Sequence, residues 1–430
     1  MALPQAGAFI ASAAALLLLT TATLGRGGEA GWAQGLVLLA GGLGLATAAL
    51  TPVFPPRPLH AAALLWLLPI MGCWVQSLTL PAFAHPFWAE AAKALPGIGS
   101  GSIALDPYAA QSDALRLLAY GGFAALGLSL AACGQAQRAT LAIAATIALF
   151  SLAALLLVPD QPGAAAGKVR HAADAAYPFT SRNTFCAFAG TGAVIAAANL
   201  AALPRRATLW WLTVLAICTA ALLASHSRAG LAATLIGLAT AILIARPSRR
   251  TVPLAMAAAA ILATASLLSL TGLRATALPD DLGIRTAIWQ ASAAIALDHL
   301  WLGLGSLDRA LQMQPGDWGE RHILRAHNIY LQAIAERGLP ATIAALSAVA
   351  LALAHSARGL RNRYPAGRVQ PAIAFGATAL FGSHGLVDFS LYAPTNAAIL
   401  SLLLGMACAT LPPALPRRQG FATNAQPFQS

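Results

Sequence analysis

Charged side chains are scarce in this sequence. Only 9% of its 430 residues are Asp, Glu, Lys or Arg, and 58% are hydrophobic, whereas a soluble domain carries about a quarter charged residues. Apolar runs such as 141–158 and 341–354 recur, and each can contribute to the roughly 20-residue span that a bilayer requires. The composition therefore predicts an all-α integral membrane protein, with a single polytopic membrane domain over residues 1–430.

Several familiar chemical motifs are also missing. The five cysteines lie far apart with no CxxC spacing, which disfavours a zinc or redox pair. The absence of a Walker loop and of a GxSxG elbow excludes nucleotide-fuelled and serine-hydrolase functions. His322 and His327 with Glu320 give no recognised ligand spacing, so we predict no metal and no cofactor. No basic run is interleaved with aromatics, so the net charge of +12 does not indicate nucleic acid.

The hydropathy pattern predicts about twelve membrane spans. They cover about residues 8–24, 32–50, 60–80, 113–132, 138–158, 183–203, 208–224, 229–246, 251–270, 339–357, 369–388 and 395–411. The connections that follow the second, fourth, sixth, eighth and tenth spans, and the tail at 412–430, are rich in arginine. By the positive-inside rule, these segments and both termini are cytoplasmic.

Three longer segments then lie on the outer side, at 81–112, 159–182 and 271–338. In the last one, Asp280 and Asp281 precede apolar residues at helical spacing, which predicts a surface helix. A second helix is predicted from about 327 to 337, ended by Gly338. Residues 271–338 are therefore expected to form one large ordered loop.

Two predicted spans begin on the outer side with a Ser-Arg pair. Ser227 is placed to cap the eighth span, and Arg228 falls in its first turn. A helix N-terminus carries partial positive charge, so an arginine there is disfavoured by about 0.3–1 kcal/mol unless an anion lies between the two. A phosphate group would satisfy both, and Arg182 after Ser181 repeats the pattern. Interface anchoring of the arginines is the alternative.

The large loop carries further candidates. Arg285 shares a helical face with Trp289 and Ser292, which suits phosphate or sugar binding or, alternatively, a solvated face with its tryptophan among lipid headgroups. His327 opens a helix just after Arg325 and before Asn328. Both the arginine and the helix N-terminus disfavour an imidazolium, so a neutral general base is predicted, with a structural histidine as the alternative.

His384 and Asp388 lie four residues apart near the outer end of the predicted span 369–388 and are expected to share its face. Ionisable groups at that depth rarely face lipid. The spacing alone does not separate a catalytic dyad, a proton-coupled transport pair and a structural lock, of which we favour the lock.

These motifs together resemble the O-antigen ligase and polymerase family of bacterial membrane glycosyltransferases. The resemblance covers about residues 179–396. It is carried by the stretches 179–185, 227–230, Arg285 with Trp289 and 299–305, 327–339 and 384–389. The stretch from His327 is the most specific, and the stretch from His384 reads slightly more like the exopolysaccharide polymerases of the group.

The resemblance implies a GT-C-like, metal-independent, inverting glycosyltransferase in the bacterial inner membrane, with its active site and large loop facing the periplasm. Its donor would be an undecaprenyl-pyrophosphate-linked glycan, and its acceptor lipid A-core or another lipid-linked repeat, in lipopolysaccharide or exopolysaccharide biosynthesis. Arg228, Arg285 and Arg182 would hold the pyrophosphate and His327 would act on the acceptor hydroxyl. The supporting residues would be Ser227, Arg325, Asn328, His384 and Asp388.

Two other classes of protein compete with this interpretation. A polysaccharide-precursor transporter or lipid flippase also needs many helices and intramembrane ions, but the inverted repeats and broken paired helices typical of transporters are not evident. A structural scaffold would leave Arg228, Arg285 and His327 without a purpose.

Overall fold

The computed structural model describes residues 3–51, 55–95, 97, 101–157, 174–202, 208–245, 278–313, 325–361 and 365–409. The regular secondary structure of these ranges is helical, apart from one isolated bridge between Thr79 and Ser102. The helices that coincide with predicted spans are α1 (Leu3–Thr23), α2 (Gly31–Leu50), α3 (Arg57–Ser77), α5 (Pro107–Ala132), α6 (Ala136–Leu156), α7 (Arg182–Ala202), α8 (Thr208–Ala224), α9 (Arg228–Ala245), α14 (Leu339–Ser356), α15 (Val369–His384) and α16 (Pro394–Cys408). The predicted span at 251–270 falls outside the described residues.

The remaining helices are short or belong to the predicted large loop. They are η1 (Pro81–Phe83), α4 (Pro86–Ala94), α11 (Leu278–Asp298), α12 (Leu307–Met313), α13 (Ile329–Arg337), η4 (Ala357–Arg361), η5 (Pro365–Arg368) and η6 (Ser390–Tyr392). Both predicted loop helices are thus confirmed as α11 and α13. Helix α11 begins at Leu278, so Asp280 and Asp281 belong to its first turn.

Seven of the described helices are long and apolar enough to cross a membrane. They are α2, α3, α5, α6, α7, α9 and the segment Leu339–Arg361 that contains α14, and three shorter apolar stretches fall in α1, α8 and α16. The protein is therefore a multi-pass membrane protein. The total of twelve spans stays a prediction.

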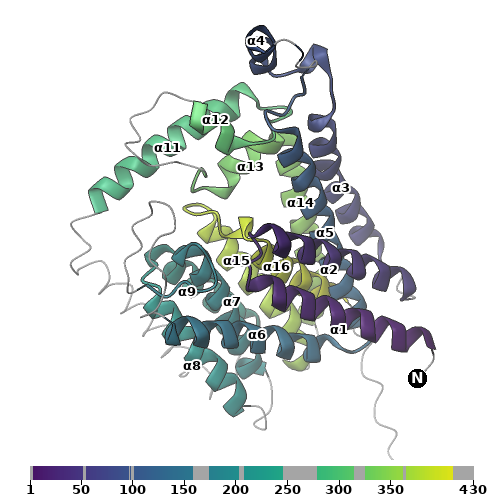
Figure 1. The fold of residues 1–430 in the computed structure, drawn as a ribbon. Helices are drawn as coiled ribbons and strands as arrows, with labels where there is room; N and C mark the ends of the chain where they lie inside the picture. The colour runs from purple at the N-terminus through teal and green to yellow at the C-terminus, as the bar shows by residue number, and fades with distance from the viewer. Residues whose placement is uncertain are drawn as a thin grey trace, which may run out of the picture.

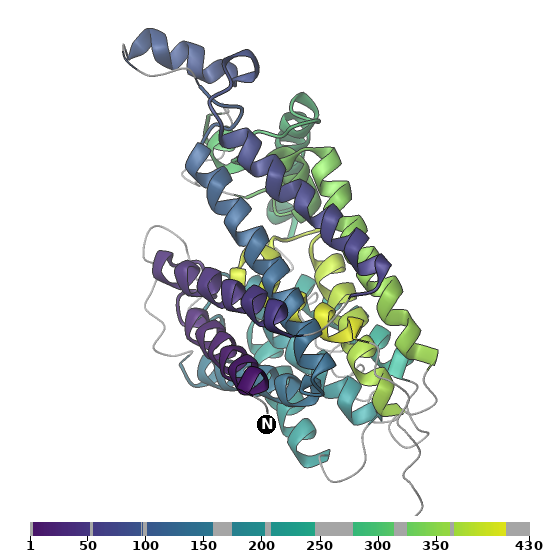
Figure 2. The same cartoon turned by 90° about the vertical axis from the view of Figure 1, so that its right-hand side faces the viewer.

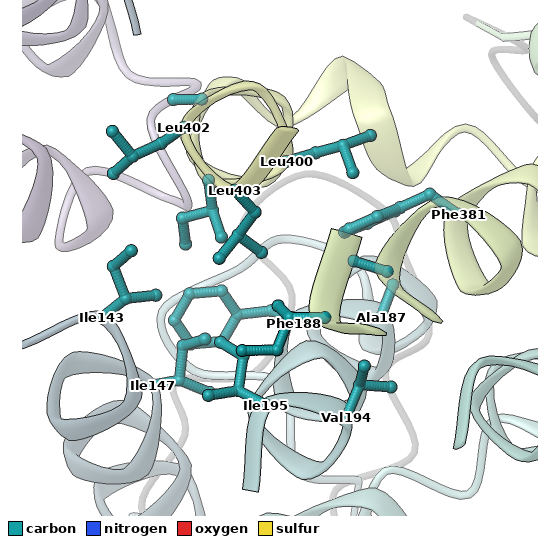
Figure 3. Close-up of a cluster of buried hydrophobic side chains, with 14 of the residues drawn as sticks. Ile143, Ile147, Ala187, Phe188, Val194, Ile195, Phe381, Leu400, Leu402 and Leu403 are labelled. Carbon is teal, nitrogen blue, oxygen red and sulfur yellow. The ribbon is translucent and has the colours of Figure 1, made fainter. Parts of the chain in front are cut away.

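Helix α7 forms the centre of the bundle and packs against α6, α8, α9 and α15. The close-up in Figure 3 shows Phe188 and Ile195 of α7 among Ile147 of α6 and Leu403 of α16, with Phe381 of α15 beside them. Side chains on every side of α7 are buried, so this helix meets protein rather than lipid around its whole circumference.

Glycines allow the helices of the bundle to approach closely. A Cβ on Gly405 of α16 would lie 1.9 Å from the carbonyl oxygen of Ala124 in α5. At the contact between α9 and α15, Gly237 and Gly376 face each other, and a Cβ on either would lie 2.8 Å from the other's carbonyl oxygen. Small residues at such crossings increase the packing contacts that hold helices together in lipid.

Helices α11, α12 and α13 form a separate layer above one end of the bundle, next to the raised ends of α3, α5 and α14 (Figures 1 and 2). This layer has its own small core, which includes Ile295, Leu304 and Leu311. Leu105, just before α5, joins that core and donates its backbone N–H to the carbonyl of Leu304 at 3.1 Å. The described parts of the loop, 278–313 and 325–338, thus form an ordered cap fixed to the bundle.

Candidate functional site

Asp388, in the turn that follows α15, lies where the cap meets the bundle. Its carboxylate is fully buried and accepts a hydrogen bond from Nδ2 of Asn183 at 2.6 Å. The backbone N–H of Phe389 donates to the same carboxylate at 2.7 Å. Nδ1 of His327 lies 4.0 Å from Asp388 Oδ2. A buried carboxylate needs such donors and a nearby cation or neutral proton carrier to offset its desolvation.

A chain of hydrogen bonds extends from Asp388 to the start of α9. Oδ1 of Asn183 accepts from the hydroxyl of Ser227 at 2.7 Å. Oγ of Ser227 in turn accepts from the backbone N–H of Gly230 at 3.2 Å, which confirms the predicted helix cap. Because Asn183 belongs to the first turn of α7, these bonds fix the starts of α7 and α9 beside Asp388, with Arg228 as the first residue of α9.

His327 is held in an unusual backbone conformation at the edge of the cap. Its φ of +50° is in the left-handed region that non-glycine residues seldom adopt, and such strain concentrates at functional sites. Its carbonyl accepts from Nε1 of Trp289 at 3.3 Å, and its ring meets that of Phe389 edge-on at 5.0 Å. Oδ1 of Asn328 accepts from the N–H groups of Tyr330 and Leu331 at 3.0 and 3.1 Å, which confirms that α13 starts there.

The predicted face of α11 points at the same place. The guanidinium of Arg285 donates to the backbone carbonyl of Val387, one residue before Asp388, while Trp289 contacts His327 as above. Ser292 on this face is fully buried. Asn183 of α7, Arg285 of α11 and His327 before α13 therefore converge on the segment 387–389, and the start of α9 is joined to them through Ser227 and Asn183.

The partly buried arginines on the predicted outer side divide into two groups. Within the described ranges, carboxylates lie within 4.0 Å of four of them, namely Arg116, Arg182, Arg325 and Arg337. Arg228 and Arg285 have no carboxylate partner among the residues that the structure describes, and Nη1 of Arg228 is buried without a hydrogen-bond partner there. These two guanidinium groups are the ones left to neutralise an external anion.

Arg182 belongs to the paired group. Its Nη1 lies 2.5 Å from Oδ2 of Asp174, and Oδ1 of the same carboxylate lies 2.9 Å from Nδ1 of His226. His226 has a φ of +51°, a second strained histidine close to the start of α9. No motif indicated Asp174 or His226 as site residues, because the contact between them joins segments about 50 residues apart.

A buried ionic cluster supports the cap from below. Nη2 of Arg337 lies 3.0 Å from Oδ2 of Asp113 in α5 and 3.8 Å from Oε2 of Glu336. The hydroxyl of Tyr392 donates to Glu336, and the guanidinium of Arg325 lies 4.6 Å from the centre of the Tyr392 ring. Burial raises the pKa of Glu336, and the charge of Asp113 raises it further. Sequence reasoning missed this cluster, apart from Arg325.

The expected helical pairing of His384 with Asp388 is wrong. Helix α15 ends at His384, and Nδ1 of His384 lies 2.5 Å from Oγ of Ser390 instead. The helix stops because the backbone of Gly385 meets α13. Its carbonyl accepts from the N–H of Ile329 at 2.8 Å, and a Cβ there would lie 2.6 Å from the Ile329 side chain. Asp388 consequently faces Asn183 and His327.

No cluster of three or more His, Cys, Asp or Glu suited to a metal ion occurs within the described ranges. Glu320 and His322, considered above as ligands, fall outside those ranges.

The chain is thus a multi-pass membrane protein with an ordered cap, beneath which arginine, histidine and aspartate side chains lie close together. The family described as O-antigen ligase matches residues 211–346 of the chain. This region contains Arg228, Arg285 and His327, and the match confirms the O-antigen ligase family predicted from the motifs. No curated protein matches the chain. The family supports a membrane function of the ligase or polymerase type, acting on a lipid-linked glycan.

Proposed function

We propose that the protein is a metal-independent, inverting glycosyltransferase that transfers a glycan from undecaprenyl pyrophosphate to a hydroxyl acceptor at the periplasmic face of the bacterial inner membrane. The acceptor would be lipid A-core or another lipid-linked repeat. The observation that carries the proposal is the convergence of Arg285 and His327 on the segment 387–389, together with the lack of a described carboxylate partner for Arg228 and Arg285.

The pyrophosphate of the donor would be held by Arg228 and Arg285. Guanidinium groups form charge-assisted hydrogen bonds with phosphate oxygens, and the N-terminus of α9 adds its partial positive charge. These interactions strengthen as the anomeric carbon–oxygen bond breaks and negative charge grows on the departing pyrophosphate. Arg182 would act indirectly, since Asp174 already occupies its guanidinium.

His327 would accept the proton of the attacking hydroxyl. The acceptor oxygen bonds to the anomeric carbon from the face opposite the pyrophosphate, so the configuration inverts while undecaprenyl pyrophosphate leaves. Asp388, 4.0 Å from Nδ1 of His327, would stabilise the imidazolium that results. Asn183 would hold Asp388 in place through its 2.6 Å hydrogen bond.

The experiment is a transfer assay with the purified full-length chain, a defined lipid-linked repeat, a chelator, and lipid A-core present or absent. The expected products are a transferred glycan and free undecaprenyl pyrophosphate. His327→Ala should slow transfer by about 10²–10⁴-fold with donor binding retained. His60→Ala, which removes an exposed histidine near the start of α3, is the matched control and should transfer normally.

Two results would contradict the proposal. One is an unchanged transfer rate in His327→Ala. The other is movement of intact lipid-linked glycan across vesicle membranes without bond transfer, which would assign the protein to the transporter or flippase class. The acceptor used would distinguish a ligase from a polymerase.

A further inference from the structure

A cavity of about 370 Å³ lies at the other end of the bundle from Asp388. Its walls come from the turn between α5 and α6, the end of α14, the start of α15 and the end of α16. The cap is joined to the start of α14, and Asp388 follows the end of α15, whereas the cavity lies at the end of α14 and the start of α15. The cavity is therefore on the predicted cytoplasmic side. No residue of the proposed active site lines it.

The cavity wall contains buried polar atoms without partners. His355 is 3% exposed. Its ring interacts with the Cys408 backbone, but neither ring nitrogen makes a hydrogen bond of good geometry within the described residues. Nε2 of Gln370 donates to Oγ1 of Thr140 at 2.9 Å, whereas its Oε1 has no partner in the same ranges. Buried polar groups are normally paired, so the wall offers an unused donor or acceptor in His355 and an unused acceptor in Gln370.

The charge around the cavity has one sign only. Arg358 lines it, one helical turn after His355. The sequence contains no Asp or Glu in the ranges 114–159, 339–387 and 389–430, which together supply every wall of the cavity. Arg358 is exposed, and these ranges contain no carboxylate that could pair with it. Anionic lipids of the cytoplasmic leaflet supply negative charge to basic pockets between membrane helices.

We propose that this cavity binds the phosphodiester headgroup of an anionic phospholipid. The phosphate oxygens accept hydrogen bonds from Arg358 and from a ring N–H of His355, and a headgroup hydroxyl donates to Oε1 of Gln370. The apolar wall, which includes Val369 and Met406, covers the glycerol backbone of the lipid. A zwitterionic headgroup is disfavoured, because its ammonium would lie near Arg358 with no carboxylate in the wall to receive it.

The test is lipid retention by the purified full-length chain, measured by native mass spectrometry after incubation with equal amounts of phosphatidylglycerol and phosphatidylethanolamine. Wild-type protein should retain one phosphatidylglycerol preferentially. Arg358→Gln and His355→Leu should each reduce that retention by about tenfold. Arg361→Gln is the matched control, because it removes an exposed arginine three residues away that does not line the cavity, and it should retain the lipid normally.

A further variant addresses the headgroup hydroxyl. Gln370→Met should weaken retention of phosphatidylglycerol and leave retention of phosphatidic acid, which lacks the glycerol hydroxyls, unchanged. Thermal unfolding in detergent verifies that each variant is folded. Equal retention in wild type and Arg358→Gln, or equal losses in Arg358→Gln and Arg361→Gln, would overturn the site. Displacement of the lipid by millimolar inorganic phosphate would overturn the assignment to a lipid and identify a soluble phosphate instead.

Because this readout does not involve catalysis, it separates the two proposals. A wild-type protein that transfers glycan but retains no phosphatidylglycerol would contradict only the lipid site. A protein that retains the lipid but transfers no glycan would contradict only the proposed function.

Discussion

The two ends of the helical bundle neutralise their arginines in different ways. At the capped end, Arg337 contacts Asp113 and Glu336, and Arg182 contacts Asp174. At the opposite end, the ranges that form the cavity contain arginines and no Asp or Glu. All 14 acidic residues of the chain lie on or beside the predicted outer side. The positive-inside rule concerns only the cationic residues. In this chain the acidic residues are confined to the outer side more strictly than the arginines are confined to the cytoplasmic side.

This difference gives a criterion for ligand sites in this protein. An arginine that is paired within the chain contributes to stability, and one that is partly buried without a carboxylate needs an anion from elsewhere. At the capped end the criterion selects Arg228 and Arg285, which we assign to the donor pyrophosphate. At the opposite end Arg358 is exposed, and the proposed lipid site depends instead on the unpaired buried atoms of His355 and Gln370 together with the lack of carboxylates.

The largest expected effect is on stability, at the buried ionic cluster. Arg337→Met would leave Glu336 and part of the Asp113 charge uncompensated, and breaking a buried pair in this way typically costs about 3–5 kcal/mol. Arg361→Gln at the opposite end should change stability by no more than about 0.5 kcal/mol, because Arg361 is exposed. Unfolding of the two variants in detergent, compared with wild type, measures the difference.

If Arg337→Met unfolded as wild type does, the cluster would not be what holds α13 on α5. The double variant Arg337→Met with Glu336→Gln refines the test, because Asp113 still has Arg116 as its partner. Removing both charges should recover part of the lost stability, since the penalty arises mainly from the partner left unpaired.

The next largest effect separates the paired and unpaired arginines of the capped end. Arg285→Gln should lower the transfer rate by about 10²–10³-fold, as expected when one donor to a developing anion is removed. Arg182→Gln should have a smaller effect on transfer and a larger one on stability, because its partner is Asp174 at 2.5 Å. Initial rates with lipid-linked glycan, together with unfolding measurements, provide both quantities.

The opposite ranking of these two variants would contradict the criterion. Arg285→Lys is a useful intermediate, because it keeps the charge but loses the planar, forked geometry of a guanidinium. It should restore only part of the activity.

Local features of this protein are predictable from sequence. Ser227 caps α9 as its residue type and position indicate, and the helical period of α11 correctly predicts that Ile288 and Ile295 are buried. Each of these predictions depends on residues a few positions apart. The motifs around these residues were also sufficient to predict the O-antigen ligase family.

Contacts between distant segments were not predictable. The contact of Asp388 with Asn183 joins residues 205 positions apart, and no periodicity indicates it. The same cause produced the error at the end of α15. The apolar residues Leu386 and Val387 continue the hydropathy of the span, but the helix stops because Gly385 meets Ile329 of α13. Tertiary packing here overrides local propensity.

The smallest expected effect concerns pH and the contact between the cap and the α4 segment. The rings of His85, which caps α4, and His299, which follows α11, lie 5.1 Å apart. Burial lowers the pKa of both, and the nearby His299 lowers the pKa of His85 further, while Asp298 partly opposes the shift at His299. The docked state therefore favours neutral rings, and protonation favours separation of the two segments.

The sign of the pH dependence follows from linkage. Both pKa values are lowered from 6.5 in the folded protein, so the contribution to docking is complete above pH 6.5 and is lost as pH falls below that value. Hydrogen exchange at the Leu105 amide, which is bonded to Leu304, should accelerate between pH 7.5 and 5 after correction for intrinsic rates. Exchange in α16 should not change, because no Asp, Glu or His occurs in that helix. His85→Phe should abolish the response at Leu105, and a response that persists in this variant would assign the pH sensitivity to another group of the capped end.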